Sequence, residues 1–166
     1  LTGFPVFPEG QQNSMLCKLL SRDIWEANKN KVDKFGFSFK SAIFSGCVNV
    51  DSGIGIYAGS SDSYDEFSDL FHPLIEGYHK IDLQSGHVSD MDASKLNCPP
   101  FPADEAAMIK STRIRVGRNL ADYPLGPGVS AQQRADIEAK VTAGLNTMNG
   151  DLAGKYYSLS TMSKED

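Results

Sequence analysis

Hydrophobic positions recur with a helical period in the stretch from residue 64 to 78. The apolar side chains there are spaced three and four residues apart, at Tyr64, Phe67, Leu70, Phe71, Leu74, Ile75 and Tyr78. This spacing is typical of a helix that buries one stripe of its surface. Pro73 lies inside the pattern, and proline lacks the N–H that a helix interior needs. We therefore expect the helix to be kinked or divided at that point.

Shorter helical segments precede this stretch. The segment from Ser14 to Leu20 is one candidate helix, and Ser21 is suited to cap a second one that runs to Asn30. Residues 49–59 are rich in glycine and predict a loop. Together these segments predict that residues 1–80 form a small all-α domain.

The second half of the chain has a different pattern. Residues 81–106 are polar and contain Pro99, Pro100 and Pro102, so they predict a linker between two units. In the following run, Ser111, Arg113 and Arg115 alternate with apolar residues, as on a β-strand that has one buried face. A single strand cannot form a sheet. Its partner strands must therefore come from a longer polypeptide or from an associated chain.

A helix is expected after this strand. Ser130 and Gln133 have the spacing of a capping box. The apolar face of that helix would carry Ile137, Val141, Leu145 and Met148. We therefore expect an α+β fold, in which the helical domain is followed by the first strand and helix of an antiparallel-sheet domain that begins at residue 107 and is incomplete at residue 166.

Composition limits the possible functions. Hydrophobic residues make up 40% of the chain, charged residues 22%, and the formal net charge is −5. A binder of nucleic acid or of membrane surfaces is usually basic, so neither partner is expected. Cys17, Cys47 and Cys98 are far apart and form no CxxC pair. This pattern disfavours a disulfide framework and a metal site, and it fits a reducing cytoplasm.

Two segments carry candidate chemistry. Arg113 and Arg115 would lie on the same face of a strand. Two neighbouring cations favour an anion between them, and planar guanidinium groups bind phosphate well. The alternative is a surface strand whose arginines pair with Asp or Glu. In the second segment, Gly53 and Gly55 let the backbone of a loop approach a ligand closely, although a plain turn has the same composition. Neither segment contains a recognisable catalytic group.

Four motifs, in this order along the chain, resemble the phosphagen (guanidino) kinases, and the arginine-using branch most closely. They are DSGIGIYA at 51–58, SYDEFSDLFHPLIEGYH at 63–79, STRIRVGRNL at 111–120 and GDLAGKYYSLSTMSKE at 150–165. The resemblance implies reversible transfer of the γ-phosphoryl group of ATP to the guanidino nitrogen of L-arginine. Residues 107–166 would then begin the ATP-binding catalytic domain.

The resemblance also implies roles for individual residues. Asp51 would assist domain closure, and Mg²⁺ would be held through the nucleotide. The arginine substrate would be bound by Ser52, Gly53, Ile54, Gly55 and Tyr57. The ATP phosphates would be bound by Ser111, Arg113 and Arg115.

Members of this family are roughly twice as long as this chain, in keeping with two domains. We therefore expect an N-terminal fragment that is inactive without the missing C-terminal part of the catalytic domain. Residues 81–107 depart from the family pattern. Two alternatives remain open: a non-catalytic scaffold of the same fold, and a kinase for another guanidino acceptor such as taurocyamine.

Overall fold

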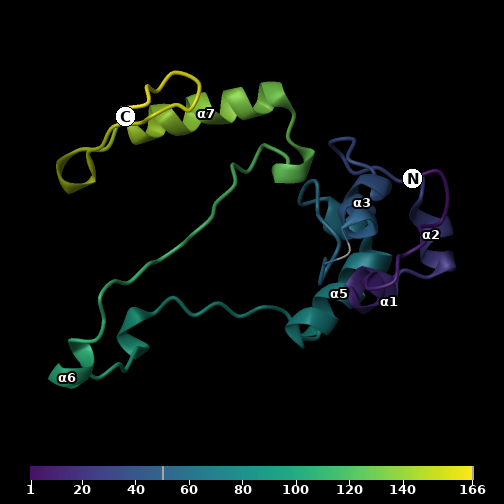
Figure 1. The fold of residues 1–166 in the computed structure, drawn as a ribbon, viewed down its shortest axis with the longest axis horizontal. Helices are drawn as coiled ribbons and strands as arrows, with labels where there is room; N and C mark the ends of the chain where they lie inside the picture. Colours follow the sequence, from purple (N-terminus) through teal and green to yellow (C-terminus); the bar gives the residue numbers. More distant parts are fainter. Residues whose placement is uncertain (50, 166) are drawn as a thin grey trace.

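The computed structural model describes residues 1–49 and 51–165. Within these residues the secondary structure is helical, apart from one isolated bridge between Val32 and Ser38. The α-helices are α1 (Met15–Leu19), α2 (Arg22–Asn28), α3 (Phe39–Val48), α4 (Ser63–Glu66), α5 (Ser68–His79), α6 (Ala103–Ala106) and α7 (Ala131–Leu145). Helices α1 to α5 cluster together, and α6 and α7 lie away from that cluster (Figure 1).

Serine side chains begin the first three helices. The hydroxyl oxygens of Ser14, Ser21 and Ser38 accept hydrogen bonds from backbone amides three residues further on. Each bond satisfies one of the amides that a helix N-terminus leaves without a partner. The predicted helices after Ser14 and Ser21 are therefore confirmed, together with the cap at Ser21.

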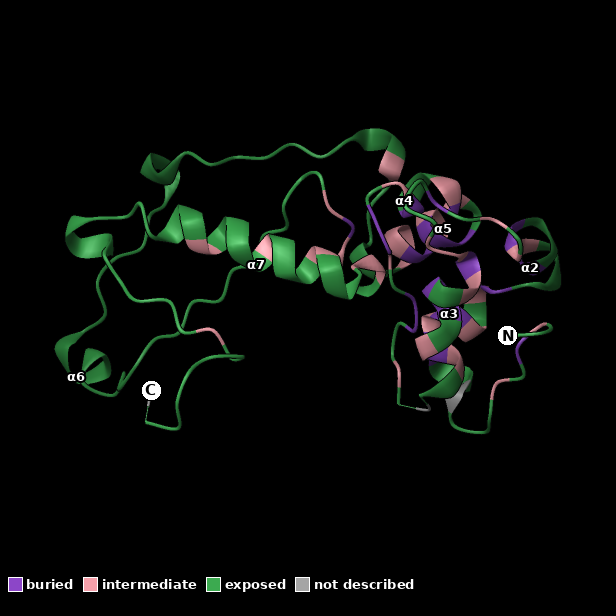
Figure 2. Cartoon of the chain, turned by 90° about the horizontal axis from the view of Figure 1, so that it is seen from above, coloured by how far each residue is buried: buried purple, intermediate pink, exposed green. Residues whose placement is uncertain are grey.

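The hydrophobic core lies among α1 to α5. A row of aromatic rings runs through it, with ring centroids 6.4 Å apart for Trp25 and Phe39, 5.5 Å for Phe39 and Phe67, and 6.2 Å for Phe67 and Phe71. Leu16, Ile43 and Leu70 fill the space beside these rings, and each is fully buried. The buried residues of the molecule are concentrated in this part of the chain (Figure 2).

The long amphipathic stretch forms two helices, but the division is not where we expected it. The break lies at Phe67, between α4 and α5, while α5 continues through Pro73. The ends of the predicted stripe are also less buried than its centre: Phe67 and Leu70 are fully buried, whereas Tyr78 is 54% exposed. Tyr78 lies in the last turn of α5, where the core ends.

No residue between Leu74 and Pro124 is buried. Residues 81–120 extend away from the helical cluster through α6 and return toward it (Figure 1). The chain meets the cluster again where the amide of Leu125 donates to the carbonyl of Gly59, at 2.8 Å.

The strand expected at residues 111–118 is absent from the described structure. Ser111, Arg113 and Arg115 are exposed, and Ile114 on the opposite face is 86% exposed. The physical reason is that no second strand lies beside this segment to accept and donate ladder hydrogen bonds. The sheet half of the predicted α+β fold is therefore missing within the described residues.

Helix α7 begins as predicted. The hydroxyl of Ser130 accepts from the amide of Gln133 at 3.2 Å, and the side chain of Gln133 accepts from the amide of Ser130 at 2.9 Å. Its predicted apolar face is formed but largely uncovered, because Val141 and Leu145 are 40% and 41% exposed. The C-terminal segment crosses α7 through Tyr156 and Ser158, whose hydroxyls donate to Glu138.

Candidate functional site

The glycine loop, residues 51–57, is held against two helices. The first amides of α1, at Met15 and Leu16, donate to the carbonyls of Gly53 and Ile54 at 2.9 and 3.0 Å. On the other side, the amide of Tyr57 donates to the carbonyl of Ala42 in α3, at 2.9 Å. The loop is thus fixed by backbone contacts that do not depend on its own side chains.

These contacts occupy two carbonyls of the loop and leave a run of its amides available. The carbonyls of Gly53 and Ile54 are occupied by α1, whereas the amides of Gly53, Ile54, Gly55 and Ile56 donate to no group among the described residues. Consecutive free amides in a loop form a site that favours an anion. The loop can therefore bind a carboxylate or a similar group through N–H donors.

A cavity of about 710 Å³ adjoins the glycine loop. The structure brings together here all the loop residues predicted to bind substrate, namely Ser52, Gly53, Ile54, Gly55 and Tyr57, and it places Asp51 beside them. Tyr57 is 52% exposed, so its side chain is accessible from solvent.

Four residues that the sequence did not point to also line this cavity: Met15, Ser45, Asn49 and Tyr78. The first three are contributed by the start of α1 and the end of α3. Tyr78 was predicted to be part of the buried stripe of α5. Its position in the last turn of α5, at the end of the apolar stripe, was the only indication in the sequence that it could face a cavity.

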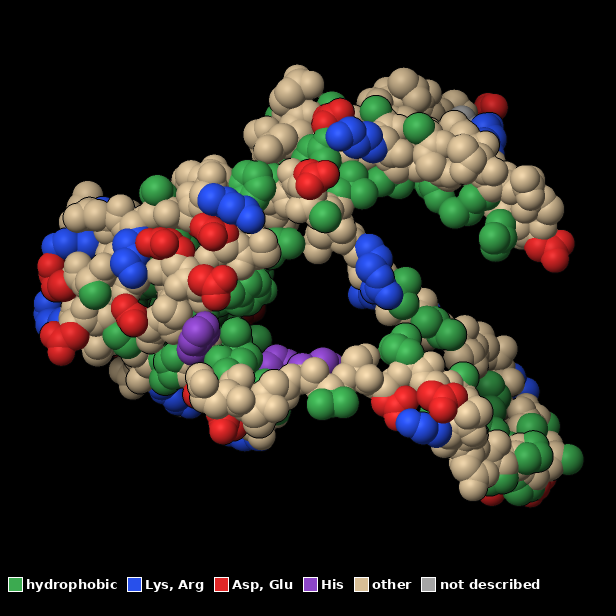
Figure 3. Space-filling model, turned by 180° about the vertical axis from the view of Figure 1, so that it is seen from behind, with side chains coloured by type: hydrophobic (Ala, Val, Ile, Leu, Met, Phe, Trp, Pro, Cys, Tyr) green, Lys and Arg blue, Asp and Glu red, His purple; other side chains and the backbone are tan. Residues whose placement is uncertain are grey.

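The predicted phosphate-binding residues are not brought to this cavity. Ser111, Arg113 and Arg115 lie on the extended segment between α6 and Leu120, and all three are exposed. Lys and Arg side chains project from this segment into the open space beside it (Figure 3). The structure therefore gathers the predicted loop residues around one cavity and leaves Ser111, Arg113 and Arg115 away from it.

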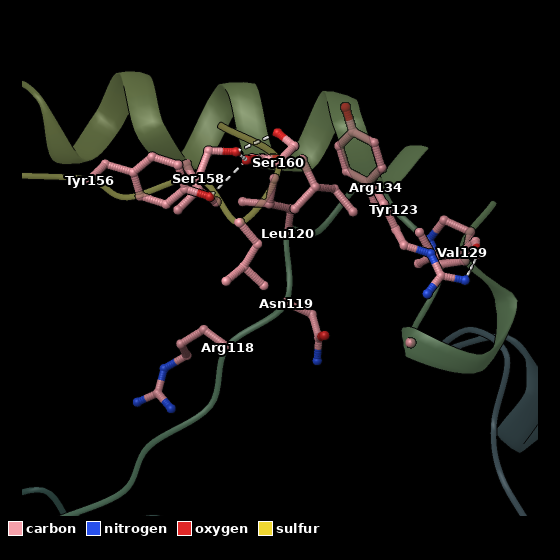
Figure 4. Close-up of a pocket in the computed structure, with 15 residues that line it drawn as sticks. Arg118, Asn119, Leu120, Tyr123, Val129, Arg134, Tyr156, Ser158 and Ser160 are labelled. Carbon is pink, nitrogen blue, oxygen red and sulfur yellow. Dashed lines mark hydrogen bonds between the residues drawn. The ribbon is translucent and has the colours of Figure 1, made fainter. Parts of the chain in front are cut away.

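A second cavity, of about 790 Å³, lies along α7. Figure 4 shows Arg134 next to Val129, whose carbonyl accepts from its guanidinium at 3.2 Å, and Tyr156 and Ser158 along the helix. Leu120, Ile137 and Val141 contribute to a mostly apolar lining. This cavity contains none of the residues predicted to bind ATP phosphates.

The chain that leaves the glycine loop is anchored by a buried carboxylate that the sequence reasoning missed. Asp33 is 3% exposed and accepts from the hydroxyls of Ser60 and Ser63, each at 2.7 Å. Its other oxygen accepts from the amides of Phe35 and Phe37 at 3.0 and 2.9 Å. The available indication was the Asp-x-x-Gly spacing before Gly36, which is typical of a turn closed by the Asp side chain.

Burial and hydrogen bonding act in opposite directions on Asp33. Burial alone would raise its pKa, but the hydrogen bonds from Ser63, Ser60, Phe37 and Phe35 together hold the pKa below its ordinary value. These donors are satisfied only by the ionised form. Asp33 therefore acts as a charged structural anchor.

The other candidate chemistry is limited. Burial raises the pKa of Cys47 to about 11, so this thiol stays protonated at neutral pH and is a poor nucleophile. Within the described ranges, no group of three or more His, Cys, Asp or Glu side chains could hold a metal ion. Among the helices described, none is long and apolar enough to cross a membrane.

Comparison with known proteins gives a consistent result. Residues 10–76 match the family described as ATP:guanido phosphotransferase, N-terminal domain. The chain is 44% identical over 160 residues to an arginine kinase of Anthopleura japonica, an alignment that covers 95% of this chain and 22% of the relative. It is 38% identical over 152 residues to arginine kinase Lit v 2.0101 of Penaeus vannamei, covering 92% of this chain and 43% of that protein.

Solved structures have the same fold. A lombricine kinase superimposes with a TM-score of 0.81 at 25% identity, over 98% of this chain and 44% of that one. The duplicated taurocyamine kinase from Schistosoma mansoni, with bound transition state analog components, gives a TM-score of 0.70 at 20% identity, over 95% of this chain and 22% of that one. The chain thus spans less than half the length of these relatives. The resemblance that the motifs indicated is confirmed for the N-terminal part of such proteins.

Proposed function

Because residues 10–76 of this chain belong to the N-terminal domain of the ATP:guanido phosphotransferases, we propose that the chain supplies the guanidino-substrate half of an arginine kinase. Acting with the C-terminal part that its relatives possess, it would transfer the γ-phosphoryl group of ATP to L-arginine, reversibly. Residues 1–80 would form the substrate domain, 81–106 the linker and 107–166 the start of the ATP-binding domain. The site would lie in the cytoplasm, where the three cysteines can remain reduced.

The observation that carries this proposal is the row of free amides in the glycine loop. The amides of Gly53, Ile54 and Gly55 would donate to the carboxylate of arginine, while the hydroxyl of Tyr57 would contact the same end of the substrate. Holding that end fixes the direction in which the guanidino group extends. This orientation is the contribution of the chain, because phosphoryl transfer depends chiefly on alignment and on charge neutralisation.

The phosphates would be bound by the second unit. Arg113 and Arg115, with Ser111, would contact the phosphate oxygens once this segment forms a strand beside partner strands. Mg²⁺ would be bound by the phosphates of the nucleotide. In the reaction, a guanidino nitrogen forms a bond to the γ-phosphorus, the bond from that phosphorus to the bridging oxygen breaks, and ADP and a proton are released. Asp51 would assist the closure of the two domains during this step.

A second candidate is the same reaction with another guanidino acceptor. The solved structures that share the fold include a lombricine kinase and a taurocyamine kinase, and the anion of taurocyamine is a sulfonate. The same amides could donate to a sulfonate. Relatives of known sequence favour arginine, since the two most similar ones described above are arginine kinases.

The proposal is tested by adding L-arginine and taurocyamine in separate titrations to the ¹⁵N-labelled chain. We expect L-arginine to shift the amide resonances of Gly53 to Ile56 at lower concentration than taurocyamine. A scaffold would show no response to either compound. Preferential binding of taurocyamine would establish the second candidate instead.

A turnover measurement completes the test. The chain alone should show no phosphoryl transfer, since its predicted phosphate residues are exposed and separate from the glycine loop. The polypeptide extended by a C-terminal part homologous to that of the relatives should be active. Turnover by the chain alone at the rate of the extended protein would contradict the proposal.

A further inference from the structure

Gly46 lies near the end of α3 with its Cα against the glycine loop. A Cβ at this position would be 2.1 Å from the carbonyl oxygen of Gly55 and 2.5 Å from its Cα. Such an overlap with backbone cannot be relieved by a side-chain rotation. Glycine is disfavoured inside a helix, so its presence here indicates a requirement of packing.

The opposite side of the same loop is also closed. Gly55 has a φ of +87°, and a Cβ on it would lie 3.1 Å from the Cβ of Leu16 and 3.1 Å from the Cα of Gly46. The peptide of Gly55 is thus enclosed between α1 and α3. Its neighbours are fixed as well, through the bonds from Leu16 to Ile54 and from Tyr57 to Ala42.

We infer that Gly46 is a positioning residue for the guanidino substrate. By carrying no side chain, it lets the Gly55 peptide lie directly on α3, and this placement sets the direction of the loop amides. Gly46 is not among the residues that line the loop cavity, so it acts only through the loop. The inference rests on the proposed function for the identity of the ligand, but the position of the loop can be tested without a ligand.

A methyl group at Gly46 would have to displace the Gly55 peptide. Because Gly53 and Ile54 are held by α1, the displacement would appear as a rotation between Ile54 and Tyr57. That rotation would turn the amides of Gly55 and Ile56 away from a bound carboxylate. ATP affinity should not change, because Arg113 and Arg115 belong to an exposed segment that is not part of this packing.

The test compares Gly46→Ala with Gly144→Ala, both ¹⁵N-labelled. Gly144 lies within α7, where a Cβ would meet nothing within 4 Å, so the control makes the same chemical change in a helix without the overlap. In the free chain, Gly46→Ala should shift the amide resonances of residues 53–57, and Gly144→Ala should leave them unchanged. In the L-arginine titration, Gly46→Ala should raise the midpoint at least tenfold, and Gly144→Ala should match the wild type.

In the polypeptide extended by the C-terminal part, Gly46→Ala should raise the KM for arginine at least tenfold and change the KM for ATP less than twofold. A merely structural defect would instead lower the active fraction and leave both KM values unchanged. If Gly46→Ala does not fold, Gly55→Ala disturbs the same peptide, through a Cβ 3.1 Å from the Cα of Gly46 and through the strain of its positive φ, and its loop resonances should shift likewise.

Unchanged loop resonances, or an unchanged arginine midpoint, would overturn the inference. A wild-type chain that ignores arginine would overturn the proposed function. In that case the comparison of free chains would still decide whether Gly46 sets the loop position.

Discussion

At the scale of single residues, Asp33 shows how a charge can stabilise a fold from inside it. Each serine hydroxyl that donates to Asp33 also accepts from the backbone: Ser63 accepts from the amides of Gly59 and Ser60, and Ser60 accepts from Asp62. Each serine hydroxyl therefore both donates and accepts, whereas the ionised carboxylate of Asp33 only accepts. It holds together the turn at residues 33–37 and the segment that follows the glycine loop.

Replacing Asp33 by Asn should destabilise the helical cluster by about 1.5 to 3 kcal/mol, the range for hydrogen bonds to a charged group. An amide nitrogen would face hydroxyl hydrogens that now donate to oxygen. Urea unfolding followed by circular dichroism at pH 7 measures the change. Asp90→Asn is the control, since Asp90 is exposed on the extended segment and should change the unfolding free energy very little.

The same residue predicts a pH dependence. The pKa of Asp33 is lowered in the folded state, so its contribution to stability is present above the pKa of an unfolded aspartate, about 3.9, and is lost as the pH falls toward the folded value. The stability difference between wild type and Asp33→Asn should therefore shrink as the pH is lowered below about 4. A difference that stays constant down to pH 2 would show that the charge of Asp33 is not responsible.

The arginine pair gives a prediction about activity rather than stability. In the extended polypeptide, Arg115→Ala should lower kcat by about 10²-fold, as expected when a group that stabilises transition-state charge is removed. Arg113→Lys should also lower it, because lysine cannot form the two-pronged contact with phosphate. Lys110→Ala is the matched control, since it removes an equally exposed positive charge nearby. A similar loss in Arg115→Ala and Lys110→Ala, with Arg113→Lys unaffected, would point to net charge instead of a phosphate site.

At the scale of elements, local sequence determined some features and long-range contacts determined others. The caps at Ser21 and Ser130 were predictable because a cap depends on residues three positions apart. The strand at 111–118 was not, because alternation creates a suitable face but not the partner strand that the ladder requires. We expected the break at Pro73, but it lies at Phe67. Pro73 is tolerated inside α5 because Leu70 and Phe71 are packed in the core and hold the helix.

Helix α7 offers a test of local stability. Its apolar side is exposed, so little tertiary packing supports it, and a helix of 15 residues is marginal alone. Ser130→Ala should destabilise its first turn by about 1 kcal/mol. Hydrogen exchange of the α7 amides measures this loss. Gln132→Ala, on the adjacent exposed position, should have no comparable effect, whereas Gln133→Ala should produce part of it by removing the other half of the capping box.

At the scale of the whole molecule, burial divides the chain unevenly. Residues 81–120 include no buried side chain, so this segment is held by local contacts and not by a core. The candidate site reflects that division. The loop residues that line the cavity come from one short motif. Met15, Ser45, Asn49 and Tyr78 were missed, because only the three-dimensional fold brings α1, α3 and α5 to the loop.

This uneven burial predicts which sites limited proteolysis should cut first. Trypsin should cut first after Lys95, Lys110, Arg113, Arg115 or Arg118, because protease needs exposed and unsupported backbone. Mass spectrometry should then identify a resistant product that contains residues 14–80. Early cleavage at Lys18 or Lys40, within helices of the core, would show that the helical cluster is not the stable unit.

The contact between Leu125 and Gly59 also has a consequence for the order of folding. It joins two segments that are far apart in the sequence, so forming it costs loop-closure entropy. The residues that connect the two segments are largely exposed, so burial within the loop does not offset this cost. The helical cluster closes shorter loops, and the burial of its core offsets their cost. Refolding should therefore begin with the cluster, and the second unit should dock onto a surface that already exists.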